Sequence, residues 1–426
     1  MIGAGVSGLA TARQLVDAYG LEAPGQVVVL ESRARLGGRI WTDRSMGTPV
    51  ELGANWIHGF RDNPITKLAK RFGAKTVDTP GSFALYDEDG TRVGDRAMAR
   101  SYRRVSRAYA AVLSLADGLG ADQSLARSLA EVDGSEGLEG RDARLFAYLA
   151  QSSFGSEWGA SNADLSTLLG EIGSEFSGVD RLLPQGYSRI VDGLAEGLDV
   201  RLEHAVRRVE DDGERVEVHT DRGTFEAERC VVTLPLGVLQ AGTVEFRPGL
   251  PEALCEAIAR IGFGQVCKLV LEFPSAFWDE EDFLGLVDAS REVAGVEWFN
   301  LHAYSGVPIL SAWTVGADAR SLEGRGLEEA TEEILAGLRR MYGPAIPKPT
   351  AVRRSSWIED PNSLGAYSFP AVGSSPADYD AFLSPVRDRI FFAGEHTSAV
   401  YPSTVHGAYL SGLAAAARVA GVEGSR

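Results

Sequence analysis

The chain has 426 residues, of which 44% are hydrophobic and 24% are charged, and its formal net charge is −17. This length allows a large core and about two domains. The negative charge argues against nucleic acid as a partner and would draw a cationic small molecule, although plain solubility also accounts for it. No run of 18 apolar residues occurs, so we expect no contact with a membrane.

Cysteine and histidine are sparse and show no spacing typical of a metal site, so we expect no bound metal. Cys230, Cys255 and Cys267 lie within apolar or helical patterns. This favours buried free thiols in a reducing compartment, and therefore a cytoplasmic protein.

The first stretch, MIGAGVSGLATARQL, has the spacing G-x-G-x-x-G at Gly3, Gly5 and Gly8, followed by apolar residues at a helical period. A tight glycine turn before a helix leaves backbone N–H groups aimed at one point. The helix dipole adds partial positive charge there, so a pyrophosphate fits. Because such turns also occur for packing reasons, the motif alone is weak evidence for a dinucleotide.

The next residues strengthen that interpretation. The run VVVLE, which ends at Glu31, predicts a buried parallel strand. Glu31 follows the glycines by about 20 residues, where an acid accepts hydrogen bonds from ribose hydroxyls. Only Met1 and Ile2 precede the glycines, whereas a strand usually has about five residues. Two explanations are open. The native chain starts further upstream, where any export signal would also lie, or the fold tolerates a first strand of only two residues.

Further elements follow in chain order. Parallel-strand patterns at the start, near 230 and near 390 predict one nucleotide-binding domain built from separated segments, with its ligand in a crevice between two lobes. The remaining expectations are a strand at PVELG, mostly helices over 61–180, a hairpin with Asp212-Gly213 in its turn, strands at KLVLEF and ILSAWTV, an amphipathic helix over 326–342, and a helix from about Thr404 to Val419.

Seven stretches, spread from residue 2 to residue 412, carry a family resemblance: GAGVSGLATARQL, VVVLESRARLGGRIWT, VELGANWIHG, VVTLPLGVL, IGFGQVCKLVLEF, WIEDPNSLGAYSFP and FFAGEHTSAVYPSTVHGAYLSG. Together they resemble the flavin-dependent amine oxidases, especially the polyamine oxidases and the related lysine-specific histone demethylases. The resemblance implies an α/β fold with a discontinuous Rossmann-type FAD-binding domain (1–60, 185–245 and 385–426). It also implies an α+β substrate-binding domain with a mixed sheet (61–184 and 246–384).

FAD is the cofactor that this resemblance implies. Arg33 and Arg39 can donate charge-assisted hydrogen bonds to its diphosphate, unless they belong to a solvated basic loop. In the family, GANW passes along the isoalloxazine, and the helix that begins at Thr404 has its N-terminus toward the flavin, where it would stabilise negative charge. The expected FAD contacts are Gly3, Gly5, Ser7, Gly8, Glu31, Arg33, Gly38, Arg39, Gly53, Ala54, Asn55, Trp56, Val206, Trp357, Gly394, Glu395, Thr404 and Val405.

Lys268 interrupts the apolar strand pattern QVCKLVLEF. Alternation places Cys267 and Leu269 on one face and Lys268 on the other, with Val266 and Val270. A buried lysine is costly without a partner, and the chain has only five lysines against 37 arginines. In the family the matching lysine holds a water at flavin N5 and assists flavin reoxidation. A lysine at a sheet edge that reaches solvent is the alternative.

The other expected catalytic residues are Tyr367, Tyr401 and His58. The tyrosines match two aromatic positions that flank the reacting amine in related oxidases, where they exclude water and favour the neutral amine. His58 is expected to accept a hydrogen bond from a substrate amine, with a turn histidine as the alternative. An acid from the region of Glu157 and Glu171 is a further candidate for a distal ammonium group, although exposed helix charge accounts for either residue alone.

These observations predict FAD-dependent oxidation of a small cationic amine, with dioxygen as the second substrate. The expected substrate is a polyamine or acetylpolyamine, and the expected products are an imine or aldehyde and hydrogen peroxide, after hydride transfer to flavin N5. An L-amino acid or monoamine oxidase is the alternative within the class, and an FAD-binding protein without turnover is the alternative outside it. The histone demethylase interpretation is disfavoured, because we find no long coiled-coil insertion.

Overall fold

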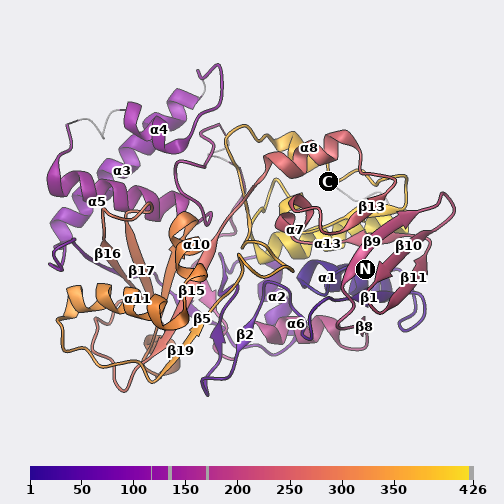
Figure 1. Ribbon diagram of the computed structural model, residues 1–426, viewed down its shortest axis with the longest axis horizontal. Coiled ribbons are helices and arrows are strands. Elements are labelled where there is room, and N and C mark those ends of the chain that lie inside the picture. The colour runs from indigo at the N-terminus through magenta and orange to yellow at the C-terminus, as the bar shows by residue number, and fades with distance from the viewer. Residues whose placement is uncertain (117, 133–136, 169–171, 422–426) are drawn as a thin grey trace.

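The computed structural model describes residues 1–116, 118–132, 137–168 and 172–421. Figure 1 shows two regions side by side, with both chain ends in the right-hand one. No helix in these ranges has the length and apolar character needed to cross a bilayer.

The right-hand region contains short parallel strands contributed by distant parts of the chain (Figure 1). β1 (Val28–Leu30) pairs with β8 (Asp199–Arg201), and β12 (Cys230–Val232) pairs with β21 (Ile390–Phe392), both in parallel. Ile2 makes parallel bridges to β1 and to β12. The stub at the chain start therefore occupies the place of the first strand, and the predicted parallel segments meet in one sheet.

The first and last long helices pack against each other. A Cβ on Gly412 of α13 (Val405–Ala420) would lie 2.3 Å from the carbonyl oxygen of Ser7 on α1 (Val6–Asp17). The two helices share one apolar core with α2 (Pro64–Arg71) and α6 (Ser188–Ala195). Both ends of the chain therefore contribute to one core.

A second sheet of the same region contains the predicted hairpin, whose turn includes Asp212 and Gly213. This sheet has the order β11–β10–β9–β13, and helices α7, α8 and α12 lie beside it. The bounds are β9 (Val206–Asp211), β10 (Val216–Thr220), β11 (Gly223–Ala227), β13 (Glu245–Arg247), α7 (Leu236–Gln240), α8 (Glu252–Arg260) and α12 (Pro376–Asp380).

The left-hand region in Figure 1 holds a six-stranded sheet of order β19–β15–β18–β17–β16–β6. Only β6 runs parallel to its neighbour, so the sheet is mixed, as the resemblance implied. Helices α10 (Gly316–Gly324) and α11 (Leu327–Tyr342) cover one face. The strands are β6 (Phe83–Tyr86), β15 (Val266–Glu272), β16 (Phe283–Val287), β17 (Gly295–Asn300), β18 (Ile309–Val315) and β19 (Ala351–Arg354).

The stretch 61–180 holds several helices, but less of it is helical than we predicted, because it also contributes strands β5 (Val77–Thr79) and β6. A run of four apolar residues such as β6 is too short to show a period. In addition to α2, its helices are α3 (Asp95–Ala116), α4 (Leu125–Glu131), α5 (Gly140–Ala150) and the π-helical turn η1 (Gln151–Gly155). The remaining short elements are β2 (Thr42–Asp43), β3 (Val50–Glu51), β4 (Trp56–Ile57), β7 (Asp180–Leu182), β14 (Gly262–Phe263), α9 (His302–Ser305), β20 (Ser368–Phe369) and η2 (Glu395–Thr397).

The expectation for the cysteines was wrong at one position. Cys230 and Cys267 are buried free thiols, whereas Cys255 is exposed. Cys255 lies on α8, whose buried side carries Leu254, Ala257 and Ile258. The helical period therefore turns Cys255 toward solvent, although its apolar neighbours in sequence suggested burial.

Candidate active site

The glycine turn has the geometry that a pyrophosphate requires. Gly3 has a φ of +104°, and a Cβ on Gly8 would lie 2.0 Å from the Gly3 oxygen. Gly5 is the open position, because a Cβ there would meet only the Gly37 oxygen at 4.0 Å. No side chain caps α1 and no acid lies in its first turn, so its first N–H groups are available to an anion.

Other predicted contacts surround this turn. Gly38 has a φ of +57° and lies against Gly5, so a Cβ on Gly38 would be 3.4 Å from the Gly5 Cα. Ser411 of α13 connects two further predicted contacts, Ser7 and Gly394. Its hydroxyl contacts the Ser7 hydroxyl at 3.3 Å and accepts a hydrogen bond from the Gly394 N–H at 2.9 Å. The structure therefore brings the start and the end of the chain together at this point.

Glu31 is buried at the carboxyl end of β1. Its Oε2 accepts from the Ala4 N–H at 2.8 Å and its Oε1 from the Arg33 N–H at 2.9 Å. The N–H of His204 donates to the Glu31 carbonyl at 2.8 Å, which places the start of β9, at Val206, beside this strand. A carboxylate has about four acceptor positions, so Glu31 can still accept from a ribose hydroxyl.

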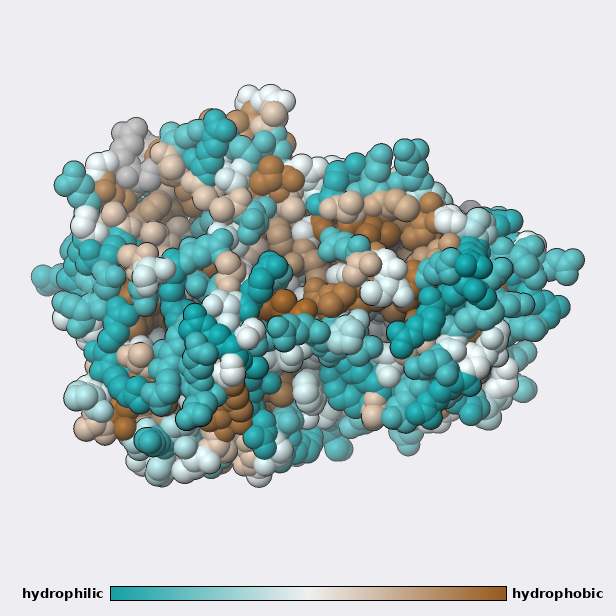
Figure 2. Space-filling model, in the orientation of Figure 1, coloured by the Kyte–Doolittle hydropathy of each residue, from teal (hydrophilic) through white to brown (hydrophobic). Residues whose placement is uncertain are grey.

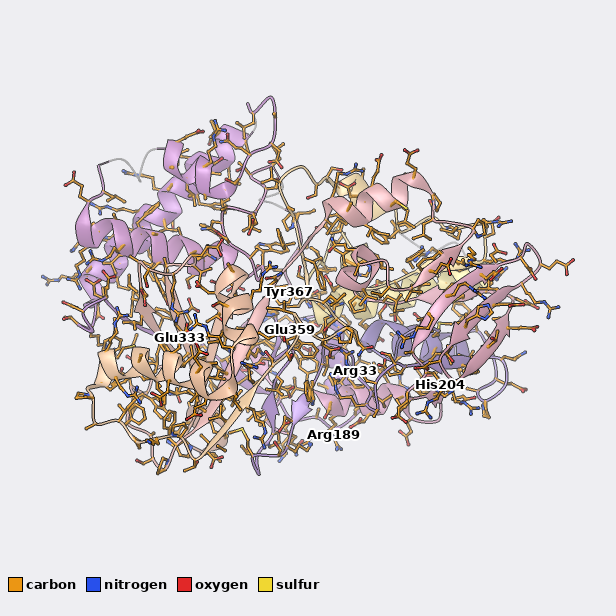
Figure 3. All side chains as sticks on the ribbon, in the orientation of Figure 1. Arg33, Arg189, His204, Glu333, Glu359 and Tyr367 are labelled. Atoms are coloured by element: carbon orange, nitrogen blue, oxygen red, sulfur yellow. The ribbon has the colours of Figure 1, made fainter. Side chains whose placement is uncertain are left out.

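Both arginines predicted to bind the diphosphate carry a carboxylate partner. Arg33 pairs with Asp360 at 2.6 Å and Arg39 pairs with Glu395 at 2.7 Å. Figure 3 shows Arg33 between the two regions of the molecule. A guanidinium has five N–H donors, so each arginine can hold its carboxylate and still donate to a diphosphate.

The segment Gly53–Trp56 reaches from the nucleotide side to Lys268. The Ala54 N–H donates to the Arg39 carbonyl at 3.2 Å. Lys268 Nζ donates to the Asn55 Oδ1 at 2.5 Å, to the Glu51 carbonyl at 3.4 Å and to the Gly53 carbonyl. The predicted FAD-side segment and the predicted catalytic lysine are therefore in direct contact.

Lys268 lies where the strand pattern placed it. It is 3% exposed on the face of β15 that α10 and α11 do not cover, while Cys267 and Leu269 pack beneath those helices. The indole of Trp313 lies 4.2 Å from its Nζ. Burial lowers the pKa of Lys268 to about 7, although the Glu51 carboxylate raises it.

Glu395 connects the two tyrosine-bearing segments. It accepts hydrogen bonds from the Ser368 hydroxyl at 2.6 Å and from the Ser403 N–H at 2.8 Å. These serines lie beside Tyr367 and Tyr401. Burial would raise the pKa of Glu395, but Arg39 and the hydrogen bonds hold it below its usual range, so the carboxylate stays ionised and fixes both segments.

The surroundings of the two tyrosines differ. Tyr401 stacks on Phe176 with ring centroids 5.0 Å apart and an interplanar angle of 10°, and His406 lies edge-on to it at 5.0 Å. Burial raises the pKa of Tyr367 above its ordinary value.

The N-terminus of α13 carries two further predicted contacts, Thr404 and Val405. The Thr404 hydroxyl caps the helix, which begins at Val405, and no acid lies in its first turn.

Trp357 is held by a residue that the sequence analysis did not identify. Its indole N–H donates to the Leu52 carbonyl at 2.8 Å. The buried Glu323 carboxylate accepts from the backbone N–H groups of Trp357, Ile358 and Glu359 at 2.8–3.1 Å. Glu359 is labelled near the centre of Figure 3. A lone acid at the end of a helix gives no signal for this contact, because the two segments are distant in sequence.

His58 is engaged at one ring nitrogen. Its Nδ1 lies 2.7 Å from the Asp180 carboxylate, and the two side chains are 47% and 38% exposed. Partial burial lowers the pKa of His58, but Asp180, Glu157 and Glu175 together raise it above its ordinary value. A substrate would therefore meet the Nε2 side of a ring that tends to be protonated and to donate.

Figure 2 shows apolar side chains between the two regions of the molecule. Glu297 lines a cavity of about 40 Å³ with Ser152 and Trp313, which is room for about three water molecules. Glu157 has an exposed side chain, yet desolvation by surrounding protein raises its pKa. The charges of His58 and Glu297 also affect the pKa of Glu157, so these groups lie near one another. Glu171 lies outside the described residues.

Glu297 and Ser152 were missed by the sequence analysis. Glu297 interrupts the strand GVEWFN, which is the same signal that indicated Lys268. Ser152 lies on η1, a π-helical turn of a kind often found at functional sites. The pKa of Glu297 is raised by burial, against hydrogen bonds from Ser152 and Tyr148.

Comparison with known proteins agrees with this site. Residues 6–420 match the family described as flavin containing amine oxidoreductase. Polyamine oxidase 2 of Arabidopsis thaliana is 36% identical over 98% of this chain and 86% of its own length. Lysine-specific histone demethylase 1 homolog 2 of Oryza sativa subsp. japonica is 35% identical over 100% of this chain and 57% of its own.

A solved structure of a putrescine oxidase double mutant has the same fold, with a TM-score of 0.78 at 24% identity over 98% of this chain and 97% of that one. The family match, together with a nucleotide turn whose geometry fits a pyrophosphate, settles the class of cofactor and of reaction. The chain belongs to the flavin-containing amine oxidoreductase family and is an FAD-dependent amine oxidase.

Proposed function

We propose that this enzyme oxidises an amine that carries a second positive charge, a polyamine of the spermidine or spermine type or an acetylpolyamine that keeps a distal ammonium. The observation that supports this proposal is the pair Glu157 and Glu297. Neither carboxylate has a lysine or arginine within ion-pair distance in the described part of the chain.

Unpaired carboxylates inside a protein are costly, because the charged form loses its hydration. A distal ammonium of the substrate, bound beside these carboxylates, would replace that hydration with a charge-assisted hydrogen bond. A monoamine would leave both carboxylates without a cation, and an L-amino acid would bring a third carboxylate to the same place. The overall charge of −17 favours the approach of a cation from outside.

FAD, when bound, accepts a hydride equivalent from the carbon beside the substrate nitrogen and is reoxidised by dioxygen. The substrate nitrogen must be neutral for this transfer. We assign Tyr367 and Tyr401 to walls that exclude water and favour the neutral amine. Lys268 is assigned to the reaction with dioxygen, and Glu157 and Glu297 hold the distal end of the substrate.

The proposed reaction consumes one amine and one dioxygen and yields an imine and hydrogen peroxide. The two electrons and two protons that leave the C–N bond reduce dioxygen to peroxide. Water then hydrolyses the imine to an aldehyde and a shorter amine. No additional oxidant is required.

Anaerobic mixing tests the substrate class. We expect spermidine and spermine to bleach the flavin absorbance faster than tryptamine or any L-amino acid, and a peroxidase-coupled assay to detect one peroxide per amine in air. If tryptamine or an L-amino acid reacts fastest, the polyamine proposal is wrong and the monoamine or amino-acid alternative holds.

Glu297→Gln tests the acid that supports the proposal. A lost charge-assisted hydrogen bond corresponds to roughly tenfold to hundredfold weaker binding, so KM for spermidine should rise by that factor with FAD content unchanged. Glu280→Gln, on an exposed carboxylate, is the matched control and should leave KM unchanged. A Glu297→Gln enzyme with the parent KM would remove this residue from the substrate site.

A further inference from the structure

The charge on Lys268 is held without a carboxylate in contact. In the described ranges no side-chain carboxylate oxygen of Asp or Glu lies within ion-pair distance of its Nζ. The oxygens that accept from it all belong to Glu51, Gly53 and Asn55. Those contacts lie on one side of the nitrogen, so something else must define the opposite side.

Trp313 provides that side. It lies directly opposite Lys268 in the β15–β18 register, and therefore on the same face of the sheet. Its ring centroid is 4.2 Å from Lys268 Nζ, within the range of a cation–π contact. The indole N–H donates to the Ser311 hydroxyl at 3.1 Å, and the ring packs on Trp56 at 5.1 Å, so its position is fixed independently of the lysine.

The same indole separates Lys268 from Glu297. Glu297 lies directly opposite Trp313 in the β17–β18 register, so the lysine, the tryptophan and the glutamate form one row across three strands. Neighbouring strands lie about 4.8 Å apart, which places the outer two Cα atoms about 10 Å apart. Two long side chains of opposite charge could span that distance if the ring between them were removed.

We propose that Trp313 is a positioning residue for Lys268: its indole holds the ammonium against the Glu51–Asn55 segment and prevents it from pairing with Glu297. This inference rests on the role proposed for Lys268 in the reaction with dioxygen. It adds that the Trp313 indole, and no carboxylate, keeps Lys268 in place, so that Glu297 remains available to the substrate.

NMR of the oxidised holoenzyme with 13C-labelled lysine tests the contact without turnover. The chain has five lysines, and Lys268→Met identifies the signal of Lys268. We expect a ring-current shift of its εCH2 signal, loss of that shift in Trp313→Leu, and partial retention in Trp313→Phe. Trp298→Leu is the matched control, because Trp298 lies on β17 and packs into the core on the opposite face of the sheet. A Lys268 signal that Trp313→Leu leaves unchanged, or that Trp298→Leu moves equally, would overturn the proposal.

Rapid mixing of reduced enzyme with dioxygen tests the consequence. Trp313→Leu should slow reoxidation by about tenfold, the scale of a lost desolvated cation–π contact, and Trp313→Phe should restore most of the rate. In a Lys268→Met background Trp313→Leu should slow it no further. Equal slowing in both backgrounds would show that Trp313 only fills space and would contradict the proposal. If the enzyme does not oxidise polyamines but the NMR result is as expected, only the proposed substrate is wrong, and the contact between Trp313 and Lys268 stands.

Discussion

The parallel sheet around Ile2 and the six-stranded sheet that carries Lys268 present their functional groups in different ways. On the nucleotide side the groups are backbone N–H donors at a turn and at a helix start, and glycines make room for them. On the substrate side they are side chains in a row across β15, β18 and β17. The expected cofactor contacts at the glycine turn therefore depend on backbone shape, whereas the contacts proposed for the substrate and for Lys268 depend on cross-strand register.

A substitution in the glycine turn tests the backbone half of this comparison, and we expect it to change the enzyme more than any other substitution. In Gly8→Ala the new Cβ would lie 2.0 Å from the Gly3 oxygen, so the turn must shift and FAD should be lost, with a free energy of unfolding lower by about 3 kcal/mol. The flavin-to-protein absorbance ratio and a thermal melt measure this. Gly94→Ala is the matched control, because nothing lies within 4 Å of the added Cβ. A stable, flavin-replete Gly8→Ala enzyme would contradict the assignment of this turn.

The next effect concerns the side-chain half. Lys268→Met should slow reoxidation of reduced enzyme by dioxygen about 100-fold, the scale of one lost electrostatic partner, and should change FAD content little. The exposed Lys75, changed to Met, is the control. Parent-like reoxidation in Lys268→Met would remove the lysine from this step.

The same lysine should give the reoxidation step a pH dependence. Burial lowers the pKa of Lys268 to about 7, so the ammonium that opposes the negative charge developing on dioxygen disappears as the pH rises through that value. We therefore expect reoxidation of the parent enzyme to slow above pH 7 and that of Lys268→Met to stay flat. A falling profile in both enzymes would assign the titration to another group.

The smallest effect is expected at His58. Its pair with Asp180 is 47% and 38% exposed, and exposed pairs contribute little. Because a protonated ring repels a cationic substrate, His58→Ala should lower KM for spermidine only a few-fold, with kcat and FAD content retained, as steady-state kinetics can show. His219→Ala, on a hairpin of the nucleotide side, is the control. Identical kinetics for His58→Ala and the parent would make this histidine structural.

Features that depend on local chemistry could be predicted from the residues alone. The glycine spacing identified a turn that only residues without a Cβ can form, and the alternation around Lys268 assigned its face, because side chains on a strand alternate with a period of two. The parallel segments near 230 and 390 were also recognisable, since strands buried on both faces are continuous apolar runs.

Contacts that depend on strand register and on closure of the chain could not be predicted from the residues, because they arise only in the folded protein. The row of Lys268, Trp313 and Glu297 joins residues of three strands, and Ile2 takes the place of a first strand only because β1 and β12 lie on either side of it. The exposure of Cys255 and the hydrogen bonds that Glu323 accepts from the Trp357 segment likewise follow from packing. Such contacts join residues far apart in sequence, and no local pattern encodes which strand will lie beside which.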